Sequence, residues 1–276
     1  MENKEVIVLI PIYKNYLDAY EMTSLDYCKQ YLKNYTILII SPESLFLDKV
    51  FIDFINKEKL NVHYFSNKFF DGINGYNNLM LNMTFYKTFI DYKYMLIYQL
   101  DVLVFSDKLL EWTKKDYDYI GAPWLISENI TSFDSSGNGG LSLRKIKTFI
   151  SVLESKDLFF NEFKYYETSY RADIQYMIII RIFRKLKLSS LKLFLFLYKG
   201  NEDYFWAFYA KFFIEEYKVA SIGESLKFCF EENPSFCFNS NKKELPFGAH
   251  AWKRYDLNFW LDHVNGLDNI LSQNKR

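Results

Sequence analysis

The feature that most constrains the fold is an apolar run at residues 95–105 that carries Gln99 and Asp101 in its middle. A run this apolar is typical of a strand buried in a sheet, and ligand sites tend to form where such a strand ends. A carboxylate there is costly unless it is paired, hydrogen-bonded or bound to a cation. Asp101 therefore either binds a divalent cation, with Gln99 on the same strand face, or caps a helix or pairs with a buried arginine.

Short apolar runs and segments of helical spacing alternate along the first half of the chain. Strands are predicted at 6–10, 35–40, 62–65 and 95–105, with a further strand ending at 119–124, and helices at 20–32, 45–58 and 76–90. This alternation predicts an α/β fold in which helices flank a mostly parallel sheet. The 276 residues, half of them hydrophobic, are enough to bury a sizeable core. Residues 128–138 are polar and predict a loop.

Composition argues against two classes of protein. Lys plus Arg equals Asp plus Glu, 34 each, so bulk positive charge for binding nucleic acid is lacking. The three cysteines are odd in number and lack the CxxC spacing of a metal site, which fits a reducing compartment better than a disulfide scaffold. The polar residues 1–5 lead directly into a predicted strand without a signal-peptide pattern. We therefore expect a cytoplasmic protein that binds no nucleic acid.

The segment 171–199 is both basic and apolar. The segment contains seven lysines and arginines but only one acid, Asp173, and the apolar runs 178–180 and 193–197 lie between the basic residues. This pattern is typical of a helix at an anionic membrane surface, so peripheral contact with the inner membrane surface is one interpretation. The alternative is a packed insertion or a dimer contact in which lysine stems cover apolar surface. Neither run reaches the roughly 20 residues that a spanning helix needs.

Three further groups of residues could carry chemistry. In residues 137–144 (GNGGLSLR) adjacent glycines let backbone amides approach a ligand, or the segment is an ordinary loop before a helix starting near Leu143. Glu202 and Asp203 precede an aromatic helical run, where one could act as a general base or both could favour the helix N-terminus. His250, in the Pro/Gly-containing segment 245–252, is either a metal ligand or a structural histidine.

These motifs, in this order, resemble the glycosyltransferase-like family known as domain of unknown function 5672, of the GT-A glycosyltransferase superfamily. The resemblance spans nearly the whole chain, from the first strand to about Trp260. Its matching words are 98–101 (YQLD), 117–124 (YDYIGAPW), 137–144 (GNGGLSLR), 202–203 (ED) and 246–252 (PFGAHAW). It implies a GT-A-like α/β domain over residues 1–276, with a nucleotide-binding half at 1–125 and an acceptor and catalytic half at 126–265.

The resemblance also implies a metal site. Asp101 matches the second aspartate of the Asp-x-Asp motif of GT-A enzymes, and Gln99 replaces the first. Because a neutral amide is a weaker ligand than a carboxylate, this departure argues against coordination of the metal by two carboxylates. His250 resembles the late histidine that completes the metal site in several GT-A families. The implied cofactor is Mn²⁺ or Mg²⁺ on Asp101 and His250.

Roles for the other candidates follow from the same resemblance. Asp203, or else Glu202, matches the acid that deprotonates the acceptor in inverting enzymes. The remaining residues predicted on the nucleotide and donor side are Pro11, Tyr13, Asn77, Gln99, Asn138, Gly139, Gly140 and Arg144.

The predicted function is transfer of a sugar from a nucleotide sugar, with UDP favoured, to a hydroxyl on a glycan or lipid-linked acceptor, with inversion. A nucleotidyltransferase could share the sheet, but it is expected to carry a Gly-rich basic loop after the first strand, where residues 11–15 (PIYKN) contain no glycine. A non-catalytic glycan-binding protein would explain the many aromatic residues, and a structural or interaction protein would bind no nucleotide.

Overall fold

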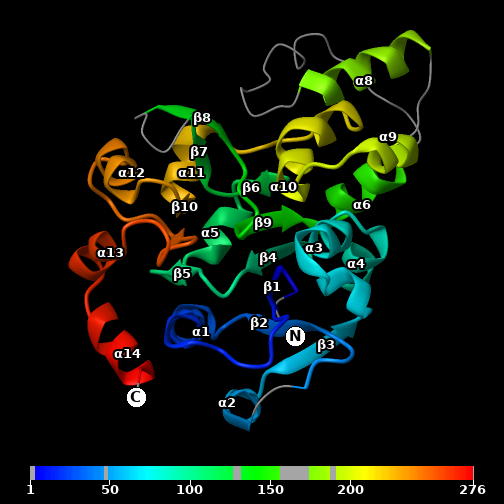
Figure 1. Ribbon diagram of the computed structural model, residues 1–276. Helices are drawn as coiled ribbons and strands as arrows, with labels where there is room; N and C mark the ends of the chain where they lie inside the picture. The colour runs from blue at the N-terminus through cyan, green and yellow to red at the C-terminus, as the bar shows by residue number, and fades with distance from the viewer. Residues whose placement is uncertain (1–3, 47–48, 127–131, 156–173, 187–190, 276) are drawn as a thin grey trace.

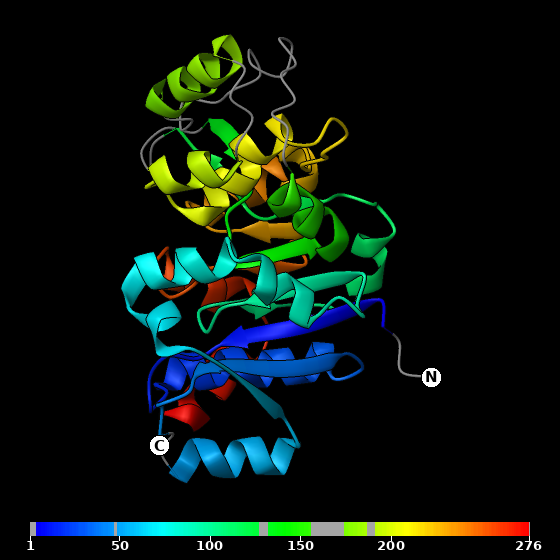
Figure 2. The ribbon, with the colours of Figure 1, turned by 90° about the vertical axis from the view of Figure 1, so that its right-hand side faces the viewer.

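The computed structural model describes residues 4–46, 49–126, 132–155, 174–186 and 191–275. At its centre lies a six-stranded sheet in the order β3-β2-β1-β4-β9-β6 (Figures 1 and 2). The strands are β1 (Val6–Pro11), β2 (Thr36–Pro42), β3 (Asn61–Phe65), β4 (Tyr94–Tyr98), β6 (Tyr119–Ile120) and β9 (Leu141–Lys145). The pairs along β3-β2-β1-β4 are parallel, whereas β9 runs antiparallel to both of its neighbours. The predicted α/β fold with a mostly parallel sheet is confirmed.

Both faces of this sheet are covered, which explains why β1 is apolar throughout. Val6 and Val8 join a core on one face, whereas Ile7 and Leu9 join a core on the other. The first face carries helices α1 (Ala19–Leu32), α2 (Lys49–Glu58) and α5 (Leu109–Thr113). The second face carries α3 (Gly72–Met80), α4 (Met83–Thr88) and α6 (Ile146–Glu154). Packing on both faces fixes these strands in place, and with them the polar residues that follow β4.

Three predicted elements differ in the structure. The run 95–105 is not one strand: β4 ends at Tyr98, and after a turn β5 (Leu103–Val104) joins a second sheet with β10 (Cys229–Phe230) and β11 (Gly248–Ala249). The predicted helix 76–90 is split, because Asn82 caps α4 by accepting a 2.8 Å hydrogen bond from the amide of Thr84. The segment after the glycine pair continues as strand β9, and α6 begins only at Ile146.

The second half of the chain packs mainly at one end of the sheet (Figure 1). Its remaining elements are β7 (Pro123–Leu125), β8 (Phe133–Ser136), α8 (Ile174–Lys185), α9 (Leu191–Leu197), α10 (Glu202–Tyr204), a π-helix η2 (Phe205–Tyr209), a 3-10 helix η3 (Ala210–Phe212), α11 (Ile222–Phe228), α12 (Pro234–Ser240), α13 (Leu257–His263) and α14 (Leu267–Asn274). Of the predicted loop 128–138, residues 128–131 lie outside the described ranges and 133–136 form β8.

The basic, apolar segment is partly packed. Tyr176 and Ile180 of α8 are buried in the main core, whereas Ile178 and Ile182 of the same helix are exposed. Arg171, Asp173 and residues 187–190 lie outside the described ranges. Among the described residues, none of the helices has the length and apolar character needed to cross a bilayer. Contact of this segment with a membrane surface stays a prediction.

The strand order places a crevice in the sheet. From β1 the chain moves to β2 and β3 on one side, and then returns to β4 on the other side of β1. Connections that leave in opposite directions open a crevice at the carboxyl ends of the two middle strands, which is where open α/β sheets bind ligands. Here those ends are Pro11 of β1 and Gln99, the residue after β4.

Candidate active site

A pocket of about 490 Å³ lies at the carboxyl ends of β1 and β4. Its lining includes every residue that the sequence predicted for the site except Arg144. These residues are Pro11, Tyr13, Asn77, Gln99, Asp101, Asn138, Gly139, Gly140, Glu202, Asp203 and His250. Residues from six separate segments of the chain therefore meet in one cavity.

Asp101 and His250 lie together at one end of the pocket. The Asp101 Oδ1 to His250 Nε2 distance is 3.4 Å, and the Asp101 side chain is 49% exposed. The backbone fixes both residues, because the amide of His250 donates to the carbonyl of Phe230 and that of Trp252 donates to the carbonyl of Asp101. His250 Nδ1 lies 3.1 Å from Oε1 of the buried Glu231. The imidazole thus has a carboxylate on each side.

These neighbours shift the ionisation of both side chains. Burial raises the pKa of the Asp101 carboxyl, but the charge of His250 and a hydrogen bond from it outweigh burial, so the net shift is downward. Burial lowers the pKa of His250, yet Asp101 and Glu231 together raise it above its usual value of 6.5. Asp101 and His250 therefore stabilise each other's charged forms.

Asp101, His250 and Glu231 fit a divalent cation. A metal-binding histidine commonly donates its second ring N–H to a carboxylate, and Glu231 stands in that position at Nδ1. Nε2 of His250 and the half-exposed carboxylate of Asp101 then remain to face a cation in the pocket. The buried Oε2 of Glu231 has no hydrogen-bond partner within the described ranges. No group of three or more His, Cys, Asp or Glu side chains there is arranged as a complete metal site, so further ligands would have to come from a bound diphosphate or from water.

Glu202, which also lines the pocket, is bound by Arg144. The Arg144 guanidinium donates to both carboxylate oxygens of Glu202, at 2.8 and 3.0 Å. The two side chains are 0% and 4% exposed. Arg144 also donates to Ser142 Oγ at 3.0 Å and to the hydroxyl of Tyr86 at 3.2 Å. Arg144 is therefore fully buried, holds Glu202 and does not line the pocket, and direct contact of its side chain with a donor stays a prediction.

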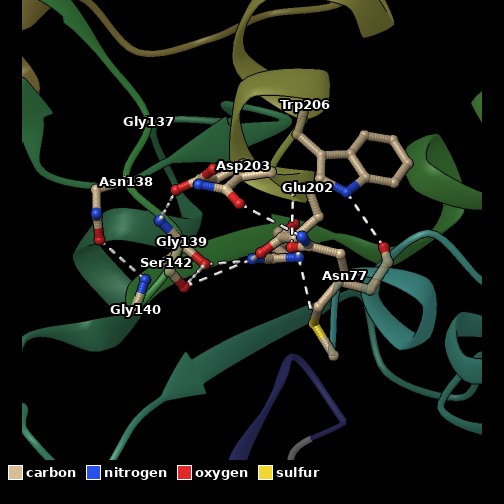
Figure 3. Close-up of polar contacts among 12 residues, drawn as sticks. Asn77, Gly137, Asn138, Gly139, Gly140, Ser142, Glu202, Asp203 and Trp206 are labelled. Atoms are coloured by element: carbon tan, nitrogen blue, oxygen red, sulfur yellow. Dashed lines mark hydrogen bonds and ion pairs between the residues drawn. The ribbon is translucent and has the colours of Figure 1, made fainter. Parts of the chain in front are cut away.

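Asp203 is adjacent to Glu202 in sequence but makes weaker contacts. Its Oδ2 accepts from the amide of Gly139 at 3.3 Å (Figure 3), and its Oδ1 accepts from the amide of Tyr204 at 2.8 Å. Burial, followed by the charge of Glu202, raises the pKa of Asp203 to about 7. A carboxyl with this pKa is suited to accept a proton near neutral pH.

The glycine pair makes room for these side chains. A Cβ on Gly139 would lie 2.7 Å from Oε1 of Glu202, and a Cβ on Gly140 would lie 2.0 Å from Nε2 of His250. The Gly139 amide is bonded to Asp203, and the Gly140 amide donates to Asn138 Oδ1 at 3.0 Å. Both amides already have partners within the chain, so their predicted contact with the donor stays a prediction. The glycines let two functional side chains approach the backbone.

Gly121 links two of the sequence motifs. A Cβ there would lie 1.9 Å from the carbonyl oxygen of Asn138, and the amides of Gly137 and Asn138 both donate to the carbonyl of Ala122. The Gly-Ala-Pro-Trp segment therefore supports the loop that carries the glycine pair. Neither segment could pass so close to the other with a larger residue at position 121.

Residues predicted for the nucleotide side also line the pocket. Tyr13 follows β1 and is 63% exposed. Asn77, on α3, accepts at its Oδ1 a 3.1 Å hydrogen bond from the backbone amide of Glu202. Gln99 lies in the turn after β4, where its amide donates to the carbonyl of Gly140 at 3.0 Å. Gln99 and Asp101 therefore share a turn, not the strand face that was predicted.

Sequence reasoning missed Glu231. It follows the three apolar residues 228–230 (FCF) and precedes Glu232 and the turn-forming residues Asn233 and Pro234. Asp101 was singled out as an acid within a long apolar run, and Glu231 shows a shorter form of that signal, an acid next to three apolar residues. Tyr76 and Asn201 also line the pocket and were not predicted, and neither carries a distinctive sequence pattern.

Comparison with known proteins places the chain in a family. Residues 59–250 match the model of a family described as "Protein of unknown function (DUF5672)". The chain belongs to this family. The match contains Asp101, the glycine pair, the acidic pair and His250. No curated protein matches the chain by sequence.

Solved structures of the galactosyltransferase LgtC share the fold of this DUF5672 member. LgtC in complex with donor and acceptor sugar analogues superposes with a TM-score of 0.51 at 12% identity, over 97% of this chain and 95% of that one. A structure of an active-site mutant of LgtC gives a TM-score of 0.51 at 14% identity, with the same coverage. The apo glycosyltransferase GlyE of Streptococcus pneumoniae TIGR4 gives 0.48 at 12% identity, over 98% of this chain but only 62% of GlyE. The fold is that of GT-A glycosyltransferases.

Proposed function

We propose that this protein is a glycosyltransferase that moves a sugar from a nucleotide sugar, with UDP favoured, to a hydroxyl on a glycan or glycolipid. The observation that carries the proposal is the joint placement of Asp101, His250 and Asp203 in one pocket at the crevice of the sheet. The first two offer a cation site, and the third offers a base whose pKa is about 7. A non-catalytic sugar-binding protein would not need these groups to converge.

Each group has a distinct role in the proposed reaction. Asp101 and Nε2 of His250 would hold Mn²⁺ or Mg²⁺, whose positive charge stabilises the leaving diphosphate when the ion is bound. Glu231 keeps the imidazole oriented through Nδ1. Asp203 takes the proton of the acceptor hydroxyl as the hydroxyl oxygen bonds to the anomeric carbon of the donor sugar. At the same time the bond from that carbon to the diphosphate oxygen breaks. One displacement of this kind inverts the anomeric configuration.

Glu202 acts indirectly in this proposal. Because both of its oxygens are bonded to Arg144, it is a poor acceptor for a substrate proton. Its negative charge is one reason why the pKa of Asp203 is raised. Glu202 is therefore a positioning residue, and Asp203 is the base. If the reaction retained configuration, Asp203 would contact the donor or acceptor without taking the proton.

Nucleotide titration tests the proposal directly. The purified protein is titrated calorimetrically with UDP, GDP and CMP, with and without Mn²⁺. We expect UDP to bind more tightly with the ion, and Asp101→Ala to remove that gain. Asp107→Ala is a matched control, since Asp107 is an exposed aspartate outside the pocket. Absence of binding to all three nucleotides with Mn²⁺ present would overturn the proposed function, and ion-dependent binding unchanged in Asp101→Ala would overturn the role of Asp101.

A further inference from the structure

A second cavity, of about 670 Å³, lies beside the candidate active site. We call it the side cavity; it is lined by residues of η1 (Asn67–Phe70), the exposed face of α3 and the segment 195–200 after the start of α9. Asn77 lines both cavities. None of the roles assigned so far uses the side cavity.

One wall of the side cavity is a row of carboxamides. Asn74, Asn77 and Asn78 have the i, i+3, i+4 spacing that places side chains on one face of α3. Asn74 and Asn78 are exposed, and their side chains make no hydrogen bond to another residue that the structure describes. A carboxamide offers both donors and an acceptor, as does a pair of neighbouring sugar hydroxyls. This wall therefore suits a carbohydrate.

The charge of the side cavity is positive. Its lining contains Lys68 and Lys199 and no aspartate or glutamate among the residues described. Lys68 Nζ lies 5.1 Å from the ring centroid of Phe69, and Lys199 Nζ lies 5.7 Å from that of Phe196. Neither lysine forms an ion pair with an acid in the described part of the chain. A cleft lined by positively charged side chains raises the local concentration of anions.

The side cavity leads towards Asp203. Residues 198–203 run from its lining into the active-site pocket, where Asn201, Glu202 and Asp203 all lie. At the boundary, Asn77 Nδ2 donates to Asn201 Oδ1 at 3.4 Å, and Asn77 Oδ1 accepts the amide of Glu202 at 3.1 Å. A chain of sugars in the side cavity would therefore extend past Asn77 towards the carboxyl of Asp203.

We infer that the side cavity binds the acceptor, and that the acceptor is an oligosaccharide that carries negative charge as carboxylate or phosphate. That the bound oligosaccharide is an acceptor rests on the proposed glycosyl transfer. Its binding can be measured without any nucleotide. Carboxamides bind the hydroxyls, and Lys68 and Lys199 bind the charged groups.

The test measures binding of three sugar hexamers by calorimetry in the absence of nucleotide: hexagalacturonate, phosphorylated maltohexaose and neutral maltohexaose. We expect at least one acidic hexamer to bind about tenfold more tightly than the neutral one, since a charge-assisted hydrogen bond contributes roughly 1.5–3 kcal/mol. The preferred acidic hexamer identifies carboxylate or phosphate as the charged group. The double variant Lys68→Gln, Lys199→Gln should abolish the preference, and Asn74→Ala with Asn78→Ala should weaken all sugars alike.

The matched control is Lys275→Gln. Lys275 is an exposed lysine whose Nζ lies 5.3 Å from the ring centroid of Tyr20, and it lines neither cavity. We expect it to bind acidic hexamers as the unchanged protein does. Equal binding of neutral and acidic hexamers, no binding of either acidic hexamer, or an unchanged preference in the double lysine variant would each overturn the inference. Failure of the inference leaves nucleotide binding intact, whereas failure of the proposed function is a loss of nucleotide binding itself.

Discussion

The active-site pocket holds charge in two different ways: at the Arg144–Glu202 pair, here called the paired side, and at Asp101 and His250, where a cation is proposed to bind, here called the cation side. On one side Arg144 and Glu202 are almost fully buried, and both oxygens of Glu202 are bonded. On the other side Asp101 is half exposed and meets only one nitrogen of His250. A fully paired, buried charge has little left to offer a ligand, whereas a half-exposed one can exchange its partner for a cation or a phosphate. Asp203 lies beside the paired side, where burial and the charge of Glu202 raise its pKa.

The largest expected effect is that of Asp203→Asn, which leaves both sides of the pocket in place but removes the proton acceptor. We expect sugar transfer to fall about 10²–10⁴-fold, the usual contribution of a general base. Nucleotide binding should be unchanged, because the cation side is untouched. Steady-state kinetics and calorimetric titration measure the two quantities. Asp262→Asn, at an exposed aspartate of α13, is the control, and near-normal turnover in Asp203→Asn would remove Asp203 as base.

The same carboxyl predicts a pH dependence. An aspartate ionises near pH 3.8 in the unfolded chain, whereas Asp203 in the folded protein ionises at about 7. Between these values the folded state binds one more proton at this site, so the contribution of Asp203 to stability falls as pH rises from about 4 to 7. Asp203→Asn should abolish this pH-dependent contribution to stability, measured by urea unfolding between about pH 4 and 7.

The same pKa predicts how turnover depends on pH. In the unchanged protein, kcat/KM should rise with pH through about 7 as Asp203 loses its proton, and a flat profile would contradict the assignment of Asp203 as the base.

The next effect concerns the paired side itself. Arg144→Met leaves the Glu202 carboxylate buried without a cation, and breaking such a pair commonly costs about 3–5 kcal/mol. The free energy of unfolding in urea measures the loss. Adding Glu202→Met should restore much of it, since two apolar side chains can replace a buried ion pair.

An exposed ion pair provides the contrast. Lys4 and Asp91 lie 2.9 Å apart, with side chains 55% and 70% exposed. Such pairs contribute about 0–1 kcal/mol, so Asp91→Ala should change stability far less than Arg144→Met. Equal effects of the two substitutions would mean that burial does not distinguish the pairs.

Arg144 also shows what the sequence could not predict. Its place two residues after Ser142 and near the glycine pair indicated a role at the site, but its partner Glu202 lies 58 residues away. Local pattern cannot pair groups across such a separation. The buried strands were predictable because burial on both faces demands an unbroken apolar run. The turn at 99–101 was not, because apolar residues resume at Val102 and conceal the change from one sheet to another.

The set of site residues was more predictable than their roles. Eleven of the twelve predicted residues line one pocket, since polar groups at strand ends and loop glycines are local signals. The roles depend on packing. By sequence, Gly139 and Gly140 could let backbone amides approach a ligand, yet their amides are bonded to Asp203 and Asn138. Which partner satisfies an amide is decided by the tertiary fold.

Gly140→Ala tests the packing of the cation side. The new Cβ would lie 2.0 Å from Nε2 of His250, so the imidazole must move. We expect a loss of stability of about 1–3 kcal/mol, typical of overpacking, together with loss of the gain that Mn²⁺ gives to UDP binding. Gly223→Ala is the control, because a Cβ there meets nothing within 4 Å. Unchanged ion-dependent binding in Gly140→Ala would show that His250 does not hold the cation.

The smallest expected effect is that of Glu231→Gln, which separates the orientation of His250 from its charge. A glutamine oxygen can still accept the hydrogen bond from Nδ1, so the fold and the ring position should be kept. The negative charge that makes the imidazole a better ligand is lost, and substitutions behind a metal-binding histidine commonly weaken metal affinity about 10–100-fold. Because the hydrogen bond survives, we expect the lower end, about tenfold, in Mn²⁺ titrations with UDP present. Glu244→Gln, at an exposed glutamate, should leave that affinity unchanged. A Glu231→Gln variant with full Mn²⁺ affinity would mean that the cation side depends on Asp101 and the diphosphate alone, and the two sides of the pocket would then differ even more than their geometry indicates.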